Sequence, residues 1–500
     1  METGTFISLA IYFIGMLGIG YYAYRKSTDD LSGYMLGGRQ LGPTVTALSA
    51  GASDMSGWML MGLPGAMYIS GISSIWIAVG LTIGAYLNYI ILAPRLRTYT
   101  EVANDSITIP DYLENRFYDH TRILRFVSAI VIIIFFTLYT SAGFVSGGLL
   151  FESAFNLDYK MGLFVVAAVV IGYTVFGGFL GVSLTDLAQG IIMLIALVLV
   201  PIVAIMELGG IGPTFTEIRE INPNYLNFFT GTTFLGIVSL LAWGLGYFGQ
   251  PHIIVRFMAI KSIKDFKAAR RIGMSWMIIS IGGAMLTGLV GIAYVSQTGI
   301  PLENEETIFI VFSNILFHPL ITGFLLAAIL AAIMSTISSQ LLVTSSALTE
   351  DFYKAFFRRQ ASDKELVLTG RISVIIVSVV ALMLSYTPRN SILNLVGNAW
   401  AGFGAAFGPI ILLSLFWKRM NQWGALAGML VGSGTVLFWI NSKLEINGLV
   451  LSKFMYEMIP GFTFSFIAVI VVSILTSSPN KDVVDTFEKM EKTLIEEQSK

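Results

Sequence analysis

Apolar stretches long enough to cross a lipid bilayer recur along almost the whole chain. A membrane-spanning helix needs about 20 mostly apolar residues, and thirteen segments meet this test: roughly 5–24, 41–70, 74–94, 123–150, 160–180, 185–208, 231–257, 272–296, 319–350, 370–386, 391–417, 422–441 and 458–476. Only 12% of the 500 residues are charged, whereas soluble chains carry about 25%. The sequence therefore predicts an all-α polytopic membrane protein and excludes a soluble enzyme or a nucleic-acid-binding protein.

The lysines and arginines predict how these segments are oriented. The basic pair Arg25–Lys26 follows the first apolar segment, whereas a signal peptide carries its basic residues in front. We therefore expect a retained first helix with the N-terminus outside. Counted from there, the inner loops hold most of the 30 lysine and arginine residues, with Arg256 among them, as the positive-inside rule requires. The C-terminus is then cytoplasmic, and residues 479–500 form a charged, solvated tail.

Two of the predicted spans contain residues that an ordinary membrane helix does not tolerate. Segment 41–70 includes Ser49-Ala-Gly-Ala-Ser-Asp-Met-Ser-Gly57, and segment 231–257 includes Trp243-Gly-Leu-Gly-Tyr-Phe-Gly-Gln-Pro251. Polar groups at this depth must line a cavity, and glycine and proline weaken a helix. The interruptions lie at matching depths five spans apart, which indicates two inverted halves and a secondary transporter with a midplane site. Other glycines, such as Gly80 and Gly84, are expected to serve helix packing only.

Two acidic residues lie at membrane depth. Asp54 falls inside the first interruption, and Asp186 begins the predicted span 185–208. Acidic residues within a membrane usually mark an ion or substrate pathway. For both residues a structural alternative exists, since a carboxylate can also cap the N-terminus of a helix or half-helix.

A polar cluster lies in segment 319–350. Ser335 and Thr336 belong to a run of hydroxyl and amide residues that ends at Gln340. Hydroxyls in membrane helices often bond to a carbonyl of their own helix. Hard cations, however, prefer oxygen ligands, and the hydroxyls of Ser335 and Thr336 facing the carbonyls of Ala52 and Met55 would form a Na⁺ cage. Spacing alone does not decide between these readings.

Several of these motifs resemble one family. Ala47-Leu-Ser-Ala-Gly-Ala-Ser-Asp-Met-Ser-Gly-Trp58 is similar to the second helix of the solute:sodium symporter family. Gly244-Leu-Gly-Tyr-Phe-Gly-Gln-Pro-His252, Ala328-Ile-Leu-Ala-Ala-Ile-Met-Ser-Thr336 and Trp400-Ala-Gly-Phe-Gly-Ala-Ala-Phe-Gly-Pro409 extend the likeness over nearly the whole chain except the tail. The branch that it resembles most is that of the bacterial sodium/proline symporters.

The resemblance implies a fold. It is a polytopic membrane protein of 13 transmembrane helices with a LeuT-type inverted five-helix repeat, in which helices 2 and 7 are broken. Helix 1 would be extra, helices 2–6 would occupy about 41–208, helices 7–11 about 231–417, and the peripheral helices 12–13 about 422–476. Residues 1–478 would then form the membrane transport domain, ahead of the tail.

The resemblance also implies site residues. The ligands of Na⁺ would be backbone carbonyls and hydroxyls, from Ala52, Met55, Ala332, Ser335 and Thr336. Residues needed for Na⁺ binding or release would be Asp54, with Ser56 and Gly57 beside it, and Asp186. Substrate would contact Tyr139, Trp243, Tyr247 and Pro251, with Ser53 and Trp58 close by.

The expected function is Na⁺-coupled uptake of L-proline across the cytoplasmic membrane by alternating access. Aromatic side chains suit the pyrrolidine ring and the ammonium group, and a half-helix N-terminus suits the carboxylate. A Na⁺ symporter for another small amino acid or a betaine-like osmolyte remains the alternative. An intramembrane enzyme is disfavoured because the chain has no cysteine and none of the common hydrolase motifs, and no channel filter is evident. The expected partners are L-proline, Na⁺ and membrane lipid, with no obligate protein partner and no nucleic acid.

Overall fold

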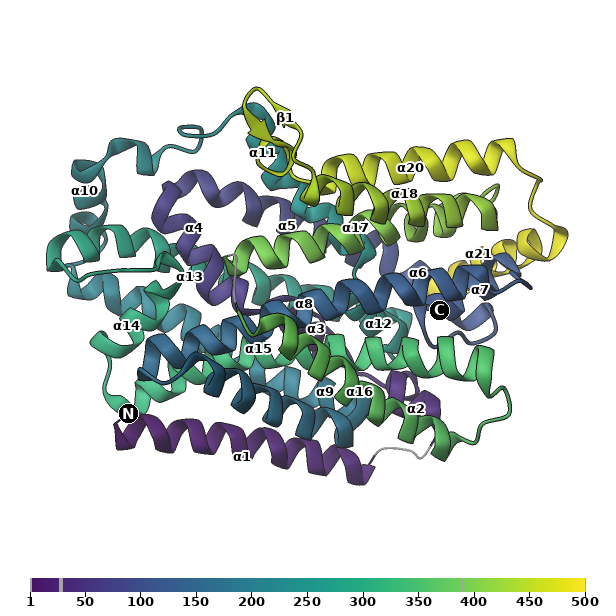
Figure 1. Cartoon of the computed structure of the whole chain (residues 1–500), viewed down its shortest axis with the longest axis horizontal. Helices are drawn as coiled ribbons and strands as arrows, with labels where there is room; N and C mark the ends of the chain where they lie inside the picture. Colours follow the sequence, from purple (N-terminus) through teal and green to yellow (C-terminus); the bar gives the residue numbers. More distant parts are fainter. Residues whose placement is uncertain (1, 27–29, 388–390, 500) are drawn as a thin grey trace.

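The protein is a bundle of long helices that run side by side along one direction (Figure 1). The computed structural model describes residues 2–26, 30–387 and 391–499. Helix α1 (Thr3–Lys26) lies along one edge of the bundle in Figure 1, and α20 (Met458–Leu475) lies along the opposite edge. The outer side chains are largely apolar, as in Phe234, which is 83% exposed, and Met383, which is 73% exposed. Such a surface suits lipid rather than water.

The first half of the chain forms the following helices. After α1 come α2 (Leu31–Leu36), η1 (Gly37–Arg39), α3 (Pro43–Asp54), η2 (Trp58–Gly62), α4 (Leu63–Ser70), η3 (Gly71–Ser74), α5 (Ile75–Leu87), η4 (Asn88–Leu92), α6 (Ala93–Val102), α7 (Ile109–Phe117), α8 (Ile123–Phe155) and α9 (Tyr159–Glu207). Segments η2 and η4 are short stretches of π-helix.

The second half is built in the same way. It comprises α10 (Ile211–Ile221), η5 (Pro223–Leu226), α11 (Phe234–Leu241), η6 (Ala242–Gly249), α12 (Pro251–Ala259), η7 (Ile263–Asp265), α13 (Phe266–Thr298), η8 (Glu305–Thr307), α14 (Ile308–Leu316), α15 (Pro319–Ser346), η9 (Ala347–Phe357), α16 (Asp363–Ser385), α17 (Ile392–Phe416), α18 (Gln422–Asn441), α19 (Leu451–Phe454), α20 and α21 (Lys481–Ser499). The exception to the all-α prediction is a two-stranded hairpin, β1 (Glu445–Ile446) and β2 (Leu449–Val450). It turns at Asn447-Gly448, both with positive φ, as tight hairpins prefer.

Among the described residues, ten helices are long and apolar enough to cross a membrane, or eleven if the bent pair Phe234–Gly249 and Pro251–Ala259 counts as one. The protein is therefore a mostly helical, multi-span membrane protein, and the count of thirteen stays a prediction. Two of the ten stretches, Trp58–Val102 and Tyr159–Glu207, are 45 and 49 residues long, more than twice the roughly 20 residues that one crossing needs. Each contains a glycine with positive φ, Gly71 at 65° and Gly178 at 55°.

Both segments that the sequence marks as irregular depart from the α-helix. Helix α3 ends at Asp54, and Met55 has ψ of 76°, far from the helical value near −42°. In the other segment, the glycine-rich residues Ala242–Gly249 form a 3₁₀-helix, Gln250 is extended, and Pro251 begins α12. Proline suits this first position because its missing N–H would be unpaired there anyway. The helical axis bends by 45° at this break.

Glycines let α5 and η6 pack backbone against backbone. A Cβ added at Gly84 would lie 2.2 Å from the carbonyl oxygen of Gly244, and one at Gly80 would lie 2.3 Å from that of Leu241. Neither position can carry a side chain without a shift of the neighbouring main chain. The predicted packing role of Gly80 and Gly84 is therefore confirmed.

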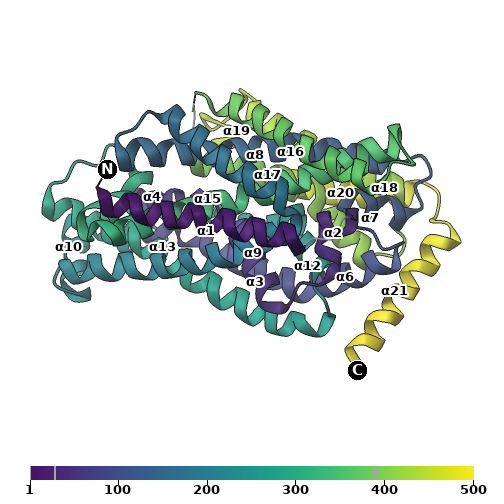
Figure 2. The same ribbon diagram turned by 90° about the horizontal axis from the view of Figure 1, so that it is seen from below.

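The C-terminal tail is not a free, solvated segment. It forms the amphipathic helix α21, which lies across one end of the bundle (Figure 2). Its apolar face is buried against the bundle through Val483, Phe487 and Met490. Two acidic residues of α21 form ion pairs with the bundle: Glu488 with Lys418, and Glu491 with Arg95 at 3.5 Å. The expectation of a solvated tail was wrong because its apolar residues share one helical face, which the count of charges does not reveal.

Candidate ion and substrate site

The break after α3 faces the polar part of α15. The hydroxyl of Ser335 donates to the carbonyl oxygen of Ala52 at 2.7 Å and to that of Ala332 at 3.1 Å, and the hydroxyl of Thr336 donates to Ala332 at 3.2 Å. All four residues are buried. Met55 is buried at the break itself, where its ψ turns the carbonyl away from the helical direction. The structure thus gathers uncharged oxygen atoms from two helices, a donor set that suits a small hard cation.

This donor set suits a monovalent cation. Over the described ranges no group of three or more histidine or acidic side chains could hold a metal ion. Divalent cations are usually bound by carboxylates, whereas the oxygens of Ala52, Ala332, Ser335 and Thr336 carry no charge. Such a set of uncharged oxygens suits Na⁺ better than a divalent ion.

Asp54 connects the two interruptions. Its carboxylate oxygen Oδ2 accepts a short hydrogen bond from the hydroxyl of Tyr247 in η6. Its main-chain carbonyl accepts one from Trp58 Nε1 at 3.2 Å. The alternative that Asp54 caps a half-helix is wrong, because Ser56 Oγ rather than Asp54 accepts from the N–H of Trp58. A residue expected to act on the cation is therefore bonded to a residue expected to act on the substrate.

The predicted substrate residues form an aromatic cluster beside this link. The ring centroids of Trp58 and Trp243 lie 6.4 Å apart, and Trp243 stacks on Tyr456 at 5.3 Å. Tyr247 meets Trp400 edge to face at 5.2 Å, and Trp400 Nε1 donates to the carbonyl of Trp243 at 2.8 Å. Of the aromatic residues of η6, Tyr247 thus contacts Asp54, and Trp243 packs between Trp58 and Tyr456.

Tyr139, Ser53 and Gly57 are three further predicted residues, and none of them takes part in the ring contacts described above. Tyr139 in α8 is 1% exposed, and its ring meets that of His252 edge to face at 6.0 Å, one residue beyond Pro251. Ser53 donates its hydroxyl to the carbonyl of Ala50 in its own helix, and its place near the substrate stays a prediction. At Gly57 an added Cβ would lie 2.6 Å from Ser146 Oγ, so glycine lets α8 approach the break.

Asp186 lies in a different polar network. Its Oδ2 accepts from Ser49 Oγ at 2.7 Å and from the guanidinium of Arg256 at 3.2 Å. Arg256 also donates to Ser339 Oγ at 2.5 Å. Because Asp186 lies within α9 rather than at its start, the N-cap alternative is wrong. The assignment of Arg256 to an inner loop is also wrong, because its side chain is 0% exposed.

The sequence reasoning missed several residues that surround the site. Trp400 was part of a quoted motif without a role, Tyr456 comes from the turn before α20, and Asn88 lies in an apolar span. A lone amide in a membrane segment is a signal that could have identified Asn88. Nothing in the local sequence of Tyr456 places it against Trp243, because that contact depends on how α20 packs.

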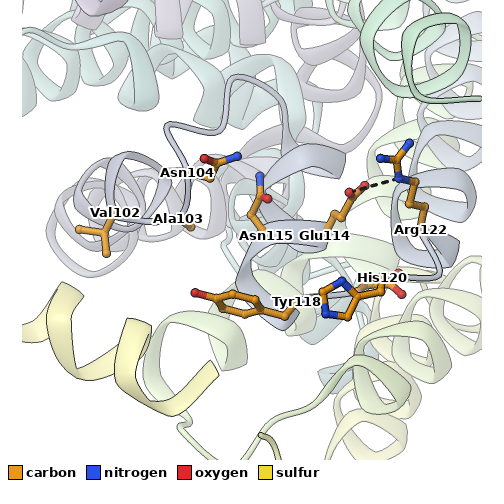
Figure 3. Close-up of a pocket in the computed structure, with 9 residues that line it drawn as sticks. Val102, Ala103, Asn104, Glu114, Asn115, Tyr118, His120 and Arg122 are labelled. Atoms are coloured by element: carbon orange, nitrogen blue, oxygen red, sulfur yellow. Dashed lines mark ion pairs between the residues drawn. The ribbon is translucent and has the colours of Figure 1, made fainter. Parts of the chain in front are cut away.

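A larger hollow lies elsewhere. It has a volume of about 500 Å³ and lies between the end of α6, helix α7 and the start of α8, where Glu114 and Arg122 form an ion pair at 3.6 Å (Figure 3). None of the predicted site residues lines it. Burial raises the pKa of Glu114, while the nearby guanidinium groups of Arg125 and Arg122 oppose that shift. This hollow is not the site that the sequence predicts.

Comparisons with known proteins agree with this picture. The sequence profile of the sodium:solute symporter family matches residues 34–432. The chain is 64% identical over 494 residues to the osmoregulated proline transporter OpuE of Bacillus subtilis, covering 99% of each chain. It is 62% identical over 479 residues to the high-affinity proline transporter PutP of the same organism, covering 96% of this chain and 100% of the other. With sodium/proline symporter 2 of Staphylococcus saprophyticus the identity is 57%, over 98% and 97% of the two chains.

Solved structures show the same architecture. A Na⁺-coupled sialic acid symporter matches with a TM-score of 0.82 at 21% identity, over 96% of this chain and 99% of the other. A nucleobase-cation-symport-1 family transporter matches with a TM-score of 0.52 at 13% identity, over 91% and 98%. At these identities the likeness concerns the fold. The fold and the sequence matches together define a membrane transporter and not an enzyme. The chain belongs to the sodium:solute symporter family.

Proposed function

We propose that the protein carries L-proline into the cell together with Na⁺. The observation that carries this proposal is the hydrogen bond between Asp54 and Tyr247, because it joins the cation side of the site to the aromatic cluster. The names of the relatives support the substrate, since they are proline transporters and sodium/proline symporters. Betaine and other small amino acids are the competing substrates that a test must include.

We propose that the chain crosses the cytoplasmic membrane thirteen times. The two very long helical stretches would each divide at their glycine of positive φ, Gly71 or Gly178, and α3 would join η2 and α4 in one broken span. Helices 2–6 and 7–11 would then form a LeuT-type inverted repeat, with broken helices 2 and 7. The N-terminus would lie outside and α21 in the cytoplasm. The likeness to the sialic acid symporter supports this fold.

In this proposal the broken helices hold both cargoes. Na⁺ would bind the carbonyls of Ala52, Met55 and Ala332 and the hydroxyls of Ser335 and Thr336, in place of the hydrogen bonds these groups now make among themselves. Proline would bind beside it, with its ring against Trp243 and Tyr247. The contact of Trp58 with Trp243 and that of Tyr139 with His252 support a role for Trp58 and Tyr139 in the pocket. Pro251 precedes His252 in the chain and would also border the pocket.

Transport would follow alternating access. Na⁺ would bind from outside and bridge α3 and α15, proline would follow, and the core would open inward, with Asp186 along the exit path. One positive charge that moves down 100 mV releases about 2.3 kcal/mol. At about 1.4 kcal/mol per tenfold ratio, this would support roughly a 50-fold accumulation of proline before any Na⁺ concentration gradient is added. One Na⁺ per proline would therefore suffice.

The test is uptake of radiolabelled L-proline into proteoliposomes that contain the full chain. We expect accumulation with an inward Na⁺ gradient and none when choline replaces Na⁺. Liposomes without protein serve as the control. Accumulation of proline without Na⁺ would overturn the coupling, and Na⁺-driven uptake of betaine or another amino acid but not proline would overturn the substrate.

A further inference from the structure

A small cavity lies on the side of α3 that faces away from α15. It has a volume of about 30 Å³ and lies between α3 with the adjoining Met55, α5, η4, η6, α12 and α13. Its polar lining comes from Asp54, Asn88, Tyr89 and Tyr247, and the rest is apolar, with Met274 and Met277 of α13. A cavity of this size holds one or two guests no larger than water. Proline does not fit, so the guest is a water molecule or a small ion.

Asn88 indicates that the cavity has a polar guest. Its side chain is 1% exposed, and over the described ranges neither the amide oxygen nor the amide nitrogen has a hydrogen-bond partner. A buried polar group without a partner costs about 1–3 kcal/mol, so such groups in native proteins usually contact water, an ion or a ligand. Asn88 is also the first residue of the π-helical segment η4, and π-helical turns occur frequently at functional sites.

Asp54 indicates that the guest is positively charged. Its side chain is 2% exposed, and while Oδ2 accepts from Tyr247, Oδ1 has no partner within the described part of the chain. None of the ion pairs among the described residues includes Asp54. Buried charges are normally paired or coordinate a metal ion, because an isolated charge in the protein interior is costly. Water would satisfy Asn88 but would leave the ionised form of Asp54 without a counter-charge, whereas a cation would stabilise that form.

We propose that this cavity is a monovalent-cation site, with Asp54 Oδ1 and Asn88 Oδ1 as its ligands. Met55 borders both this cavity and the oxygen set of Ala52 and Ser335. The two sites differ because Ala47, Ala50 and Asp54 place the cavity on another face of α3, and no described residue of α15 lines it. The proposal rests on the Na⁺ coupling proposed above. It adds Asn88 as a ligand. It also places the cation that Asp54 binds in the cavity that Tyr247 lines.

The test is a Na⁺ titration of the purified full chain in the absence of proline. Tryptophan fluorescence provides the signal, because Trp58 and Trp243 lie beside Asp54. We expect Asn88→Leu, which has similar size but no oxygen, to raise the half-saturating Na⁺ concentration at least tenfold. We expect Asn88→Asp to lower it at least threefold, since added ligand charge strengthens cation binding. The matched control is Asn441→Leu, at the exposed end of α18, which should leave the titration unchanged.

The outcomes separate this inference from the proposed function. An unresponsive wild-type protein would overturn the Na⁺ coupling itself. A wild-type protein that responds, with an unchanged titration in both Asn88 variants, would overturn the cation site and leave the coupling intact, with water as the guest. If size-exclusion elution and helical content show that Asn88→Leu does not fold, the Na⁺ titration of Asn88→Asp becomes the deciding measurement. A weaker response in Asn88→Asp would also overturn the ligand assignment.

Discussion

The two buried carboxylates of this protein have opposite surroundings. Asp186 is held by Ser49 and Arg256, and Arg256 in turn bonds Ser339, so a positive charge is built into the fold beside the negative one. Asp54 is held by the hydroxyl of Tyr247 and keeps one oxygen unpartnered among the described atoms. Both side chains are almost completely buried, so burial alone does not distinguish them.

These surroundings indicate which carboxylate can act on a mobile ion. An acid with a fixed guanidinium partner connects helices, here α9, α3 and α12. An ionised carboxylate without a basic partner is stabilised most by a cation that binds from solution together with the substrate. We therefore expect Asp54 to govern the response to Na⁺. We expect Asp186 to act mainly on the stability of its polar network with Ser49 and Arg256, and on release of the ion only through that network.

The largest expected effect is that of Asp54→Asn. The amide keeps the size and one hydrogen bond to Tyr247 but loses the charge, so we expect the Na⁺ concentration for half-maximal proline uptake to rise steeply, at least 50-fold. Proteoliposome uptake over a Na⁺ series measures it. Asp186→Asn is the comparison, and we expect a smaller shift. Equal shifts in the two variants would remove the distinction between the carboxylates.

The next effect concerns stability. Removing one partner of a buried ion pair typically costs about 3–5 kcal/mol, so Arg256→Met should lower the unfolding temperature of the purified protein clearly. The double variant Arg256→Met with Asp186→Asn should recover part of the loss, because no charge is left unpaired. Thermal unfolding followed by circular dichroism measures both. A double variant that is no more stable than Arg256→Met would show that the pair does not act as a unit.

A smaller effect on Na⁺ dependence is expected at the oxygen set of Ala52 and Ser335, to which Thr336 of α15 belongs. Thr336→Val keeps the shape and removes one hydroxyl ligand, so we expect the half-maximal Na⁺ concentration to rise about tenfold, which corresponds to about 1.4 kcal/mol. Proline affinity at saturating Na⁺ should stay close to that of the wild type. Thr344→Val, in the same helix, provides a control, because Thr344 bonds Gln340 within its own helix. A similar rise in the control would assign the effect to helix stability.

The smallest effect is expected at the tail. The ammonium group of Lys418 lowers the pKa of the exposed carboxyl of Glu488. The contribution of this pair to folding stability is therefore present above the pKa that Glu488 has in the unfolded chain. It is lost as the pH falls through the lowered pKa of the folded protein. Exposed ion pairs contribute little and are screened by salt. Lys418→Ala should change the unfolding temperature slightly at low ionic strength and not at all in high choline chloride. A change that persists in high salt would contradict this.

The sequence was sufficient for the features that depend on local composition. The apolar spans, the irregular segments around Asp54 and Gly244, and the polar face of α15 follow from residue types and spacing, and the contact between Ser335 and Ala52 agrees with the ligand set that the family resemblance implied. Side-chain contacts that depend on tertiary packing could not be predicted from the sequence. The charge of Arg256 suggests a loop residue, and only the structure shows that it lies in α12 with its side chain buried beside Asp186. The role of Asn88 is likewise evident only from the cavity that it lines together with Asp54.

The glycine contact between α5 and η6 has a mechanical consequence. Where main chain touches main chain, at Gly84 and Gly244, no side chain can change its rotamer to absorb a displacement. Packed interfaces of this kind do not deform gradually. In the proposed alternating-access cycle we therefore expect the two segments to move as one rigid part. The bending would then occur at other joints, where side chains or interrupted backbone can move.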